Sequence, residues 1–495
     1  GALVLEIVGP RLISPYYGSS LYTWSALITV TLVALAAGYA FGGRAADRSP
    51  SLTLFARIIG LAGLFVAMVP TLRHPALRLS GPLGVQWGAL AAGGVLVAPS
   101  LFLLGALGPV GVRLSALTMG SVGRKAGEVY ALSTAGSVLG ALGTGFLLVP
   151  NLPLPAILYG LAAALLALSA WGLGLSTKKI PVGRVAAAAA AALLALLPRA
   201  AQPSNLLWSK QSRYGLVQVL EEEGRRTLFV DGTTQSVARP AGPKGEWESE
   251  SSYLQSMEWA VLLRPKARRA LFIGSGAGIL PSVLERRYGI ASDVVELDPE
   301  MLEAARRFFG FRAGPSRGET LVDDGRRFLE RSKVKYSLIF LDAFGAETPP
   351  YHLFTREAFA AIRARLEPDG ILAVNLVSLV TEPGDEPWLA AYKTLSEAFP
   401  QTRAFLGSAP YHGLANVLFF CSAQPLQSPP GLKSRPEIRV NVDLLLANEL
   451  RADPFRLSRV PELTDDFAPL EFLLTRTAVE WRKSIQRTAE PVLLQ

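Results

Sequence analysis

The first two-fifths of the chain consists of long apolar runs joined by short loops. Residues 21–43, LYTWSALITVTLVALAAGYAFGG, form the clearest run, and the segment RAADR follows it. A continuous apolar run of this length predicts a helix that crosses a bilayer. Comparable runs lie near residues 53–72, 85–110, 127–149 and 155–175. The pattern therefore predicts a multi-span α-helical membrane domain over residues 1–198.

Basic residues in the loops predict the orientation of these spans. Arg44 and Arg48 mark the end of the run at 21–43 as cytoplasmic, because positively charged loops stay on that side. The loops alternate consistently if residues 1–14 are the remainder of a first span that enters from the cytoplasm. The basic loops hold Arg113, Arg124, Lys125, Lys178, Lys179 and Arg184, and the loop near Asn151 is uncharged. We expect a membrane protein of the bacterial inner-membrane type.

The apolar segment at 185–197 leaves the side of the second half of the chain open. It has about 13 residues, roughly 20 Å of helix, whereas the hydrocarbon core of a bilayer is about 30 Å thick. If the segment crosses, the rest of the chain lies outside the cell. If it lies at the interface or re-enters, the rest is cytoplasmic.

Two acidic residues fall inside or at the edge of apolar segments. A carboxylate within a membrane is expensive, so Glu6 and Glu128 are functional candidates, with Arg11 or Arg113 as partners. The alternative is that such pairs only hold helices together. Gly136 and Gly140 have the four-residue spacing that suits close helix packing.

The second half of the chain changes to the patterns of strands and shorter helices. Residues 199–262 alternate apolar and polar positions around a turn, which predicts β-hairpins. Over residues 263–495, strands alternate with helices, and this predicts a Rossmann-like, doubly wound and mainly parallel sheet. The predicted strands are LFIG, VVELD, ETLVDD, YSLIFLDAF, GILAVNL and NVLFFCS.

Residues 270–298 carry the strongest chemical signal. They predict a buried strand, a turn with Gly274, Gly276 and Gly278, a helix, and a second strand that ends at Glu296. Glycines let the backbone approach a ligand, and the following helix directs its free N–H groups at it. An acidic residue about 20 positions on can accept hydrogen bonds from two ribose hydroxyls. These features predict a nucleoside pocket, whose cytosolic ligand favours a cytoplasmic second half.

Composition and charge narrow the choice of function. The chain has 495 residues, of which 50% are hydrophobic, and a net charge of +9. Much of the basic excess lies in the loops between apolar runs, so we expect no nucleic-acid partner.

One cysteine and three scattered histidines give no metal-ligand spacing, and we predict no metal. The chain starts at Gly1 within an apolar run; we expect processing or a missing start, and no signal peptide is recognisable.

Several motifs together carry a resemblance to a known family. They are LEIVGPRL, GSSLYTWS and YALSTAGSVLGALGTGF in the apolar half, and VDGTTQS, FIGSGAGI, VELD, DDGRRFL, LDAFGAETPPYHLFT and LTDDFAPLE afterwards. The second half resembles the spermidine synthase family of aminopropyltransferases, within the class I S-adenosylmethionine-dependent transferase fold. With the apolar half, the chain resembles the membrane-fused spermidine synthase-like proteins of bacteria.

The resemblance implies roles for individual residues. For the cosubstrate it implies Gln235, the glycines Gly274, Gly276 and Gly278, the ribose carboxylate Glu296 with Asp298, and the adenine-binding pair Asp324 and Gly325. For catalysis it implies Asp342, as base or amine anchor, and Tyr253. Beside these we place His352, which could orient Asp342 or contact the acceptor. Candidates for the acceptor pocket are Tyr214, Asp465 and Asp466.

The chain departs from the family pattern where a polyamine would lie. Ala277 stands where the family has an aspartate that meets the cationic arm of the cosubstrate. Gly345 stands where it has the second aspartate of its active-site loop, and Leu254 and Gln255 replace a His-Glu pair. The nucleoside half of the site is kept and the acceptor half is altered. Phe344 makes the pocket more apolar, which favours a lipid-like or amphipathic acceptor from the bilayer.

Three functions follow from these observations. The resemblance implies aminopropyl transfer from decarboxylated S-adenosylmethionine to an amine, and a homodimer unless the membrane anchor changes the assembly. Ala277 favours a second function, methyl or alkyl transfer from S-adenosylmethionine to a membrane-embedded acceptor. The third is a polyamine transporter or sensor with a ligand-binding soluble domain, in which Glu6 and Glu128 line a path.

Overall fold

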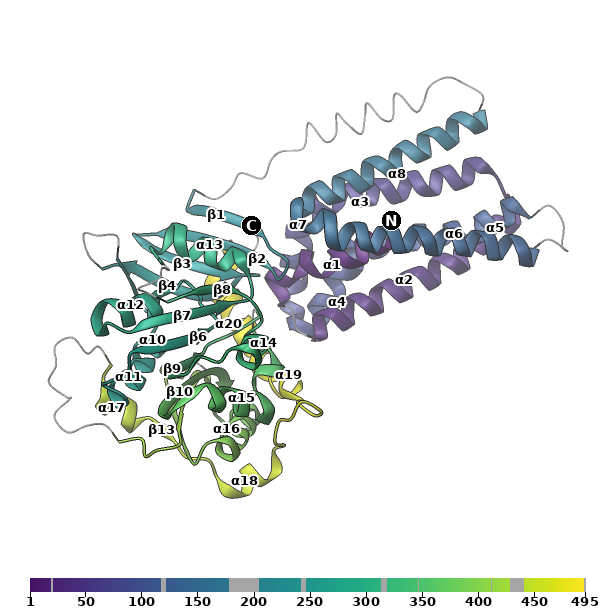
Figure 1. Ribbon diagram of the computed structural model, residues 1–495. Helices are drawn as coiled ribbons and strands as arrows, with labels where there is room; N and C mark the ends of the chain where they lie inside the picture. The colour runs from purple at the N-terminus through teal and green to yellow at the C-terminus, as the bar shows by residue number, and fades with distance from the viewer. Residues whose placement is uncertain are drawn as a thin grey trace. The chain divides into compact units, whose positions relative to one another are not determined.

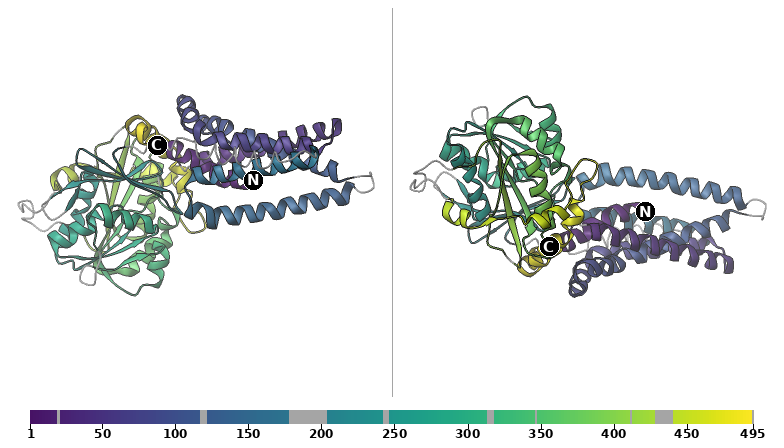
Figure 2. Two further views of the ribbon diagram at one scale, coloured as in Figure 1. Left: turned by 90° about the horizontal axis from the view of Figure 1, so that it is seen from above. Right: turned by 90° about the horizontal axis from the view of Figure 1, so that it is seen from below.

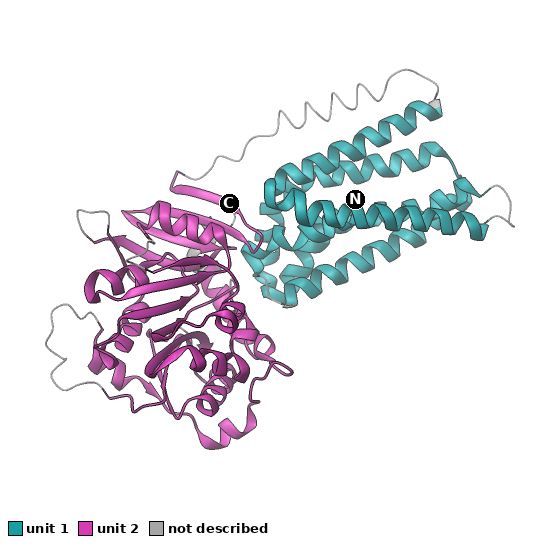
Figure 3. Cartoon of the chain, viewed as in Figure 1, with its two compact units in different colours: residues 1–203, 489–495 teal, residues 204–488 magenta. Residues whose placement is uncertain are grey.

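The structure is a computed structural model that describes residues 1–18, 21–116, 122–177, 204–241, 246–312, 318–345, 347–410, 412–427 and 440–493. The chain forms two compact units, residues 1–203 with 489–495 and residues 204–488 (Figure 3). We describe each unit by itself. The segment at 185–197 and the basic residues Lys178, Lys179 and Arg184 lie outside the described residues.

The first unit is helical in its described parts (Figure 1). Its helices are α1 (Ala2–Tyr17), α2 (Leu21–Arg48), α3 (Leu52–Ser80), α4 (Gly84–Leu96), α5 (Ala98–Ser115), α6 (Val122–Leu142), a π-helical turn (Gly143–Leu148), α7 (Val149–Asn151) and α8 (Leu154–Thr177). Five stretches are long and apolar enough to cross a membrane: Tyr22–Arg48, Leu52–Leu96, Ala98–Ser115, Val122–Asn151 and Leu154–Ser176. The expected series of apolar helices is therefore confirmed.

Three details of the first unit differ from expectation. The run at 85–110 is divided, because α4 ends at Leu96 and α5 begins with a proline in its first turn, where the missing N–H costs nothing. Glu128 pairs with Lys125, 2.6 Å away on the same helix, and not with Arg113. Within the described residues, close packing involves Gly38 and Gly42 of α2, where an added Cβ would strike the backbone of α5, while Gly136 has open space around it.

The second unit begins with an antiparallel sheet of five strands in the order β1-β2-β3-β4-β5. The strands are β1 (Leu206–Gln211), β2 (Leu216–Glu222), β3 (Arg225–Val230), β4 (Thr233–Pro240) and β5 (Trp247–Ser249). Turns that contain Gly224 and Gly232 connect β2 to β3 and β3 to β4, as expected for hairpins. One face packs through Val217, Val219 and Leu228 against an apolar cluster that includes Ala277 and Ile279. The hairpins thus form a wall beside the glycine-rich turn.

The larger sheet has eight strands in the order β13-β11-β12-β10-β9-β6-β7-β8. Its strands are β6 (Arg269–Ile273), β7 (Ala291–Glu296), β8 (Thr320–Val322), β9 (Tyr336–Leu341), β10 (Leu366–Leu379), β11 (Gln401–Leu406), β12 (Leu414–Ser422) and β13 (Glu449–Leu450). The five strands from β10 to β8 are parallel, and β12, β11 and β13 pair antiparallel. The predicted mainly parallel, Rossmann-like sheet is confirmed.

Helices cover both faces of this sheet (Figure 2). They are α10 (Ser252–Met257), α11 (Trp259–Leu263), α12 (Ile279–Tyr288), α13 (Pro299–Phe308), α14 (Gly325–Arg331), α15 (Arg356–Arg365) and α16 (Glu386–Ala398), followed by α17 (Val442–Ala447), α18 (Pro454–Arg459), α19 (Leu470–Leu473) and α20 (Thr475–Leu493). Along β9 alternate residues face opposite layers: Ile339 and Leu341 join one cluster, Leu338 and Phe340 the other. Burial on both faces explains the continuous apolar pattern of the central strands.

The parallel arrangement brings the carboxyl ends of β6, β7, β8 and β9 to one edge. Gly274 follows β6, Glu296 ends β7, Asp324 comes two residues after β8 and Asp342 follows β9 directly. Ligands of open α/β sheets bind at this edge. Polar residues spread over 69 positions of sequence, from Gly274 to Asp342, are therefore collected at one place.

Candidate active site

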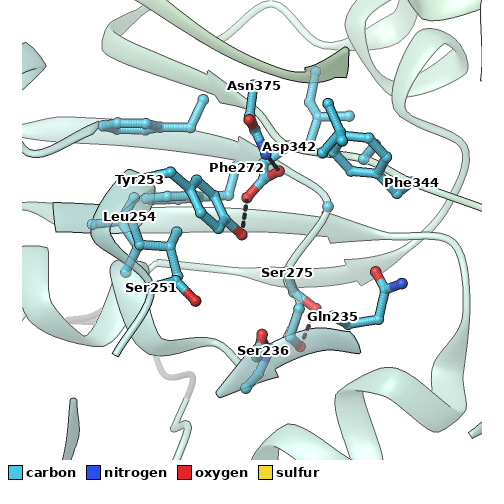
Figure 4. Close-up of a pocket in the computed structure, with 18 of the residues that line it drawn as sticks. Gln235, Ser236, Ser251, Tyr253, Leu254, Phe272, Ser275, Asp342, Phe344 and Asn375 are labelled. Carbon is cyan, nitrogen blue, oxygen red and sulfur yellow. Dashed lines mark hydrogen bonds between the residues drawn. The ribbon is translucent and has the colours of Figure 1, made fainter. Parts of the chain in front are cut away.

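A cavity of about 540 Å³ lies at this edge of the larger sheet. Its walls come from β4, the turn after β6, the ends of β7 to β10, the start of α10, the loop after β9 and helix α20. Figure 4 shows Tyr253, Asp342 and Asn375 at one side and Ser275, Ser236 and Gln235 at another. The cavity collects most of the residues that the sequence singled out.

The glycine-rich turn needs its glycines for space as well as for backbone conformation. The backbone angle φ is 89° at Gly274, 49° at Gly276 and 69° at Gly278. Residues that carry a side chain rarely adopt such values. An added Cβ at Gly274 would strike the carbonyl oxygen of Asp342, and one at Gly276 would lie 2.8 Å from the Ser236 hydroxyl. The turn is thus packed against the loop after β9 and against β4, and it fixes the cavity wall.

Glu296 faces the turn from the end of β7. One of its oxygens accepts from the backbone N–H of Ser275 at 2.9 Å and from the Ser275 hydroxyl at 3.0 Å, and the other accepts from the Asp298 N–H at 3.0 Å. Burial raises the pKa of Glu296 in spite of these donors. The carboxylate is held in one orientation beside the cavity.

Asp298 and Asp324 both line the cavity and both begin helices. Asp298 accepts from the Glu300 N–H at 3.0 Å as the N-cap of α13, and burial raises its pKa. Asp324 caps α14 by accepting from the Arg327 N–H at 2.9 Å. Burial acts to raise the pKa of Asp324, but the helix N–H groups and His352 outweigh it and lower the pKa. Gly325, at the first position of α14, also lines the cavity.

His352 contacts Asp324 and not Asp342. Its Nε2 lies 3.0 Å from Oδ2 of Asp324. The expectation that His352 orients Asp342 is therefore wrong: the short helix Tyr351–Leu353 places its ring beside α14. His352 is not among the residues that line the cavity. Its contact with the cavity wall runs through the side chain of Asp324.

Asp342 receives two hydrogen bonds from uncharged groups. The Tyr253 hydroxyl donates to Oδ2 at 3.3 Å and the Asn375 side-chain amide donates to Oδ1 at 2.8 Å (Figure 4). Burial raises the pKa of Asp342, while these two donors act to lower it. Burial and the charge of Asp342 raise the pKa of Tyr253 well above its ordinary value. The two donors to Asp342 are therefore both neutral side chains.

Asn375 was missed by the sequence reasoning. It is 2% exposed and sits in the apolar run ILAVNLV of β10. Its amide oxygen accepts from the side chain of Asn416 on β12 at 3.0 Å, and Asn416 in turn contacts Ser408. A buried amide inside a strand is a signal in itself, because such a group must find partners.

Gln235 and Tyr214 line the cavity from the hairpin region. Gln235 lies on β4 next to Ser236, whose hydroxyl accepts from the Ala277 N–H at 3.1 Å. Tyr214 is 52% exposed and belongs to the turn between β1 and β2, where its N–H donates to Ser212. Both residues line the same cavity as the glycine-rich turn.

Asp465 and Asp466 lie outside the cavity lining. Asp465 accepts from the Thr355 hydroxyl at 2.6 Å and from Arg326 at 3.0 Å, and Asp466 is exposed. Asp465 therefore links its loop to the starts of α14 and α15. We do not retain these two residues as acceptor ligands.

The charges that line the cavity are all of one sign. The described lining contains six carboxylates and no lysine, arginine or histidine; the carboxylates are Glu250, Glu296, Asp298, Asp323, Asp324 and Asp342. Glu250 pairs with Arg239 and Arg225, and Asp323 pairs with Arg327 at 3.0 Å. The positions that depart from the family pattern add no charge. Ala277 is an apolar residue within an apolar cluster, and Leu254 is an apolar residue that is largely buried. The cavity therefore favours a cationic ligand.

Helix α20 closes the cavity from the side of the loop after β9. Trp481 lines the cavity and meets the Phe344 ring edge to face, with 6.0 Å between the ring centroids. Arg482, 1% exposed, forms an ion pair with Glu347, which is 4% exposed. Arg482 also donates to the Thr233 hydroxyl at 2.9 Å. One helix thus holds the loop that follows Asp342 against the turn that precedes Gln235.

No group of three or more His, Cys, Asp or Glu residues is placed to hold a metal ion within the part of the chain that the structure describes. Cys421 is buried in β12, and burial raises the pKa of its thiol to about 12. The described lining of the cavity offers carboxylates, amides and hydroxyls.

Several of the known proteins that this chain is similar to are polyamine aminopropyltransferases. Residues 254–425 match the family model of the spermine/spermidine synthase domain. The chain is 36% identical over 131 residues to the polyamine aminopropyltransferase of Vibrio vulnificus, covering 26% of this chain and 43% of that protein. It is 29% identical over 194 residues to polyamine aminopropyltransferase 2 of Pseudomonas aeruginosa, covering 37% of this chain and 52% of that protein. The chain thus spans about half the length of these relatives.

Solved structures include one of a probable spermidine synthase from Corynebacterium glutamicum. The similarity covers 52% of this chain and 96% of that chain, at 17% sequence identity and a TM-score of 0.43.

Proposed function

We propose, from the premise that residues 254–425 are a spermine/spermidine synthase domain, that this protein is an aminopropyltransferase. It would transfer the aminopropyl group of decarboxylated S-adenosylmethionine to an amine. Asp342 acts as the base or as the anchor of the reacting amine. The nucleoside is held by Glu296 and the turn at Gly274, Gly276 and Gly278.

The observation that carries this proposal is the charge around Asp342. The carboxylate faces a cavity whose described lining holds no positive side chain, and its two donors are neutral. A sulfonium and an ammonium are attracted by such a site, whereas the carboxylate of S-adenosylmethionine would meet no positive side chain in the described lining. The decarboxylated cosubstrate is therefore the better match.

The chain's residues supply binding, orientation and the removal of a proton. Glu296 would accept from the ribose hydroxyls, Gln235 would contact the cosubstrate, and Asp324 with Gly325 would border the adenine. Asp342, with a pKa raised by burial, would accept a hydrogen bond from the reacting amine or take its proton. Tyr253 and Asn375 fix the direction of the Asp342 oxygens.

The proposed reaction balances as a simple displacement. The lone pair of a neutral amine forms a bond to the methylene carbon next to the sulfonium. The carbon–sulfur bond breaks, and its electron pair stays on sulfur, which leaves neutral methylthioadenosine. The proton from the new ammonium passes to Asp342 or to water. Alignment of the amine with the carbon–sulfur bond supplies much of the rate.

Product analysis tests this proposal. The purified full chain is incubated with an amine mixture and with either cosubstrate, and the nucleoside products are separated. We expect methylthioadenosine from the decarboxylated compound, and a fall in rate of about 10²–10⁴ in Asp342→Asn. Glu330→Gln, the same change of carboxylate to amide at the surface of α14, is the matched control. S-Adenosylhomocysteine from S-adenosylmethionine would overturn the proposal.

Methyl or alkyl transfer is the second candidate, and Ala277 is the observation that favours it. This position is 1% exposed and packs with Val217 and Ile279, so it offers no charge to a cationic arm. The same product analysis separates the two reactions, because methylthioadenosine marks aminopropyl transfer and S-adenosylhomocysteine marks methyl transfer.

We also propose that the first unit is embedded in a membrane and that the second is cytoplasmic. Support comes from five sufficiently long apolar stretches and from large apolar side chains left exposed, such as Leu132 at 77% and Phe146 at 80%. Extraction of membranes with alkaline carbonate should leave the protein in the pellet. Protease added to right-side-out vesicles should spare the second unit, and cleavage there would place it outside.

A further inference from the structure

The proposed function places the acceptor amine at Asp342. From there the cavity continues along β10 beyond Asn375. Val377 is two residues further, so it faces the same way and lies ~6.6 Å along the strand. Its partner on the antiparallel strand β12 is Asn416. Both residues line the cavity. These two positions are therefore the next that a ligand extending from Asp342 along the sheet would meet.

Neither of these positions provides a charge. Val377 is apolar and 7% exposed. The Asn416 amide donates to Asn375 at 3.0 Å, and its oxygen lies 3.4 Å from the Ser408 hydroxyl. The remaining lining near this end is apolar or small, and includes Phe344, Ala409, Leu414 and Ala415.

The other carboxylates of the cavity are already engaged elsewhere. Glu250 pairs with Arg239 and Arg225. Glu296 and Asp298 face the glycine-rich turn and the start of α13. Asp323 pairs with Arg327, and Asp324 caps α14 and contacts His352. Among the six carboxylates of the described lining, Asp342 is the one that is hydrogen-bonded to Asn375 of β10 and to Tyr253.

We propose that the acceptor carries one amine and an uncharged, largely apolar tail. This inference rests on the proposed function. The amine lies at Asp342, and the tail follows β10 past Val377 and Asn416. A four-carbon diamine would bring its second ammonium to about this distance, where it would be desolvated without a carboxylate to accept it.

Two acceptors of matched size test the proposal. 1-Aminopentane and 1,4-diaminobutane have the same number of heavy atoms, and they differ in a terminal methyl against a terminal ammonium. With decarboxylated S-adenosylmethionine and the full chain, we measure methylthioadenosine release and obtain kcat/KM for each. We expect 1-aminopentane to be favoured by at least about tenfold, which corresponds to one lost charged hydrogen bond.

A pair of variants tests the position of the tail. Asn416→Asp and Asn416→Leu both lose the hydrogen bond to Asn375, but only the first adds a charge. We expect Asn416→Asp to shift the ratio of the two kcat/KM values toward the diamine by at least about tenfold relative to Asn416→Leu. Because the readout is a ratio within one variant, a partial loss of folded protein does not affect it.

The outcomes separate this inference from the proposed function. A wild-type preference for 1,4-diaminobutane overturns the inference and leaves aminopropyl transfer standing. Equal ratios in Asn416→Asp and Asn416→Leu would also overturn it, since the tail would then not pass this position. Release of no methylthioadenosine with any amine would overturn the proposed function itself.

Discussion

The side-chain amide of Asn375 donates a hydrogen bond to Asp342 across 2.8 Å. The donor is neutral, so it orients the carboxylate without cancelling its charge. Burial raises the pKa of Asp342, and Asn375 is the larger of the two donors that act against this rise. The pKa of Asp342 therefore depends on burial, which raises it, and on a residue from the neighbouring strand, which lowers it.

Replacing Asn375 should move the acid limb of the pH–rate profile. In Asn375→Leu the carboxylate loses a donor that stabilises its charged form, so the pKa of Asp342 rises further. Because the base must be deprotonated, kcat/KM should begin to fall at a higher pH than in the wild type. Tyr253→Phe should shift the limb the same way by less. An unmoved limb in Asn375→Leu would mean that Asp342 does not titrate in the reaction.

Asp342→Asn should make the protein more stable at neutral pH. The folded-state pKa of Asp342 is raised above its ordinary value, so the neutral form is favoured by folding. The stability that this form contributes is present at low pH and is lost as pH rises through the folded-state pKa. The variant keeps a neutral group at all pH values, and the Tyr253 hydroxyl can accept from the new amide.

The measurement is the midpoint of thermal unfolding across a pH series. We expect the midpoint of Asp342→Asn to exceed that of the wild type at pH 7 and to match it once the pH is below the ordinary pKa of an aspartate in the unfolded chain. A lower midpoint at pH 7 would show that the charged form of Asp342 is stabilised by contacts beyond Tyr253 and Asn375.

The ion pair between Arg482 and Glu347 should be required for a stable active-site loop. Both side chains are almost fully buried, so Arg482→Met leaves a buried charge on Glu347, which costs about 3–5 kcal/mol. Glu347→Gln combined with Arg482→Met removes both charges and should recover much of this loss. Chemical denaturation measures the free energy of unfolding, and a double variant no better than the single one would contradict the pairing.

The sequence was sufficient for residues that directly follow apolar strands. Glu296, Asp324 and Asp342 each come at or just after the end of a parallel strand, and such ends meet at one edge of a sheet. Their meeting follows from chain direction alone. The alternation of strands and helices predicted the mainly parallel sheet, and the length of the apolar runs predicted the helices of the first unit.

Residues whose position depends on tertiary packing could not be predicted in this way. Asn375 lies inside a strand, and only the register of β9 with β10 sets it beside Asp342. Asp465 is held away from the cavity by Arg326 and Thr355, which lie more than 100 residues earlier in the chain. Such contacts leave no periodic trace in the sequence.

Two single variants, Gly274→Ala and Gly289→Ala, are compared to test whether the glycine-rich turn shapes the site. Both glycines have positive φ, 89° and 64°, so each substitution carries a similar backbone strain of about 1–2 kcal/mol. An added Cβ at Gly289 has open space within the described residues, whereas at Gly274 it would strike the carbonyl of Asp342 and lie 3.0 Å from Cα of Ala343. Only Gly274→Ala should displace the loop that carries Asp342.

Calorimetry with methylthioadenosine separates these effects. We expect Gly289→Ala to bind the nucleoside as the wild type does, with a modestly lower unfolding midpoint. Gly274→Ala should lose affinity by tenfold or more, about 1.4 kcal/mol, because the cavity wall and the Asp342 backbone must both move. Equal affinities in the two variants would mean that the nucleoside does not lie against this turn, and the proposed binding site would then have to be abandoned.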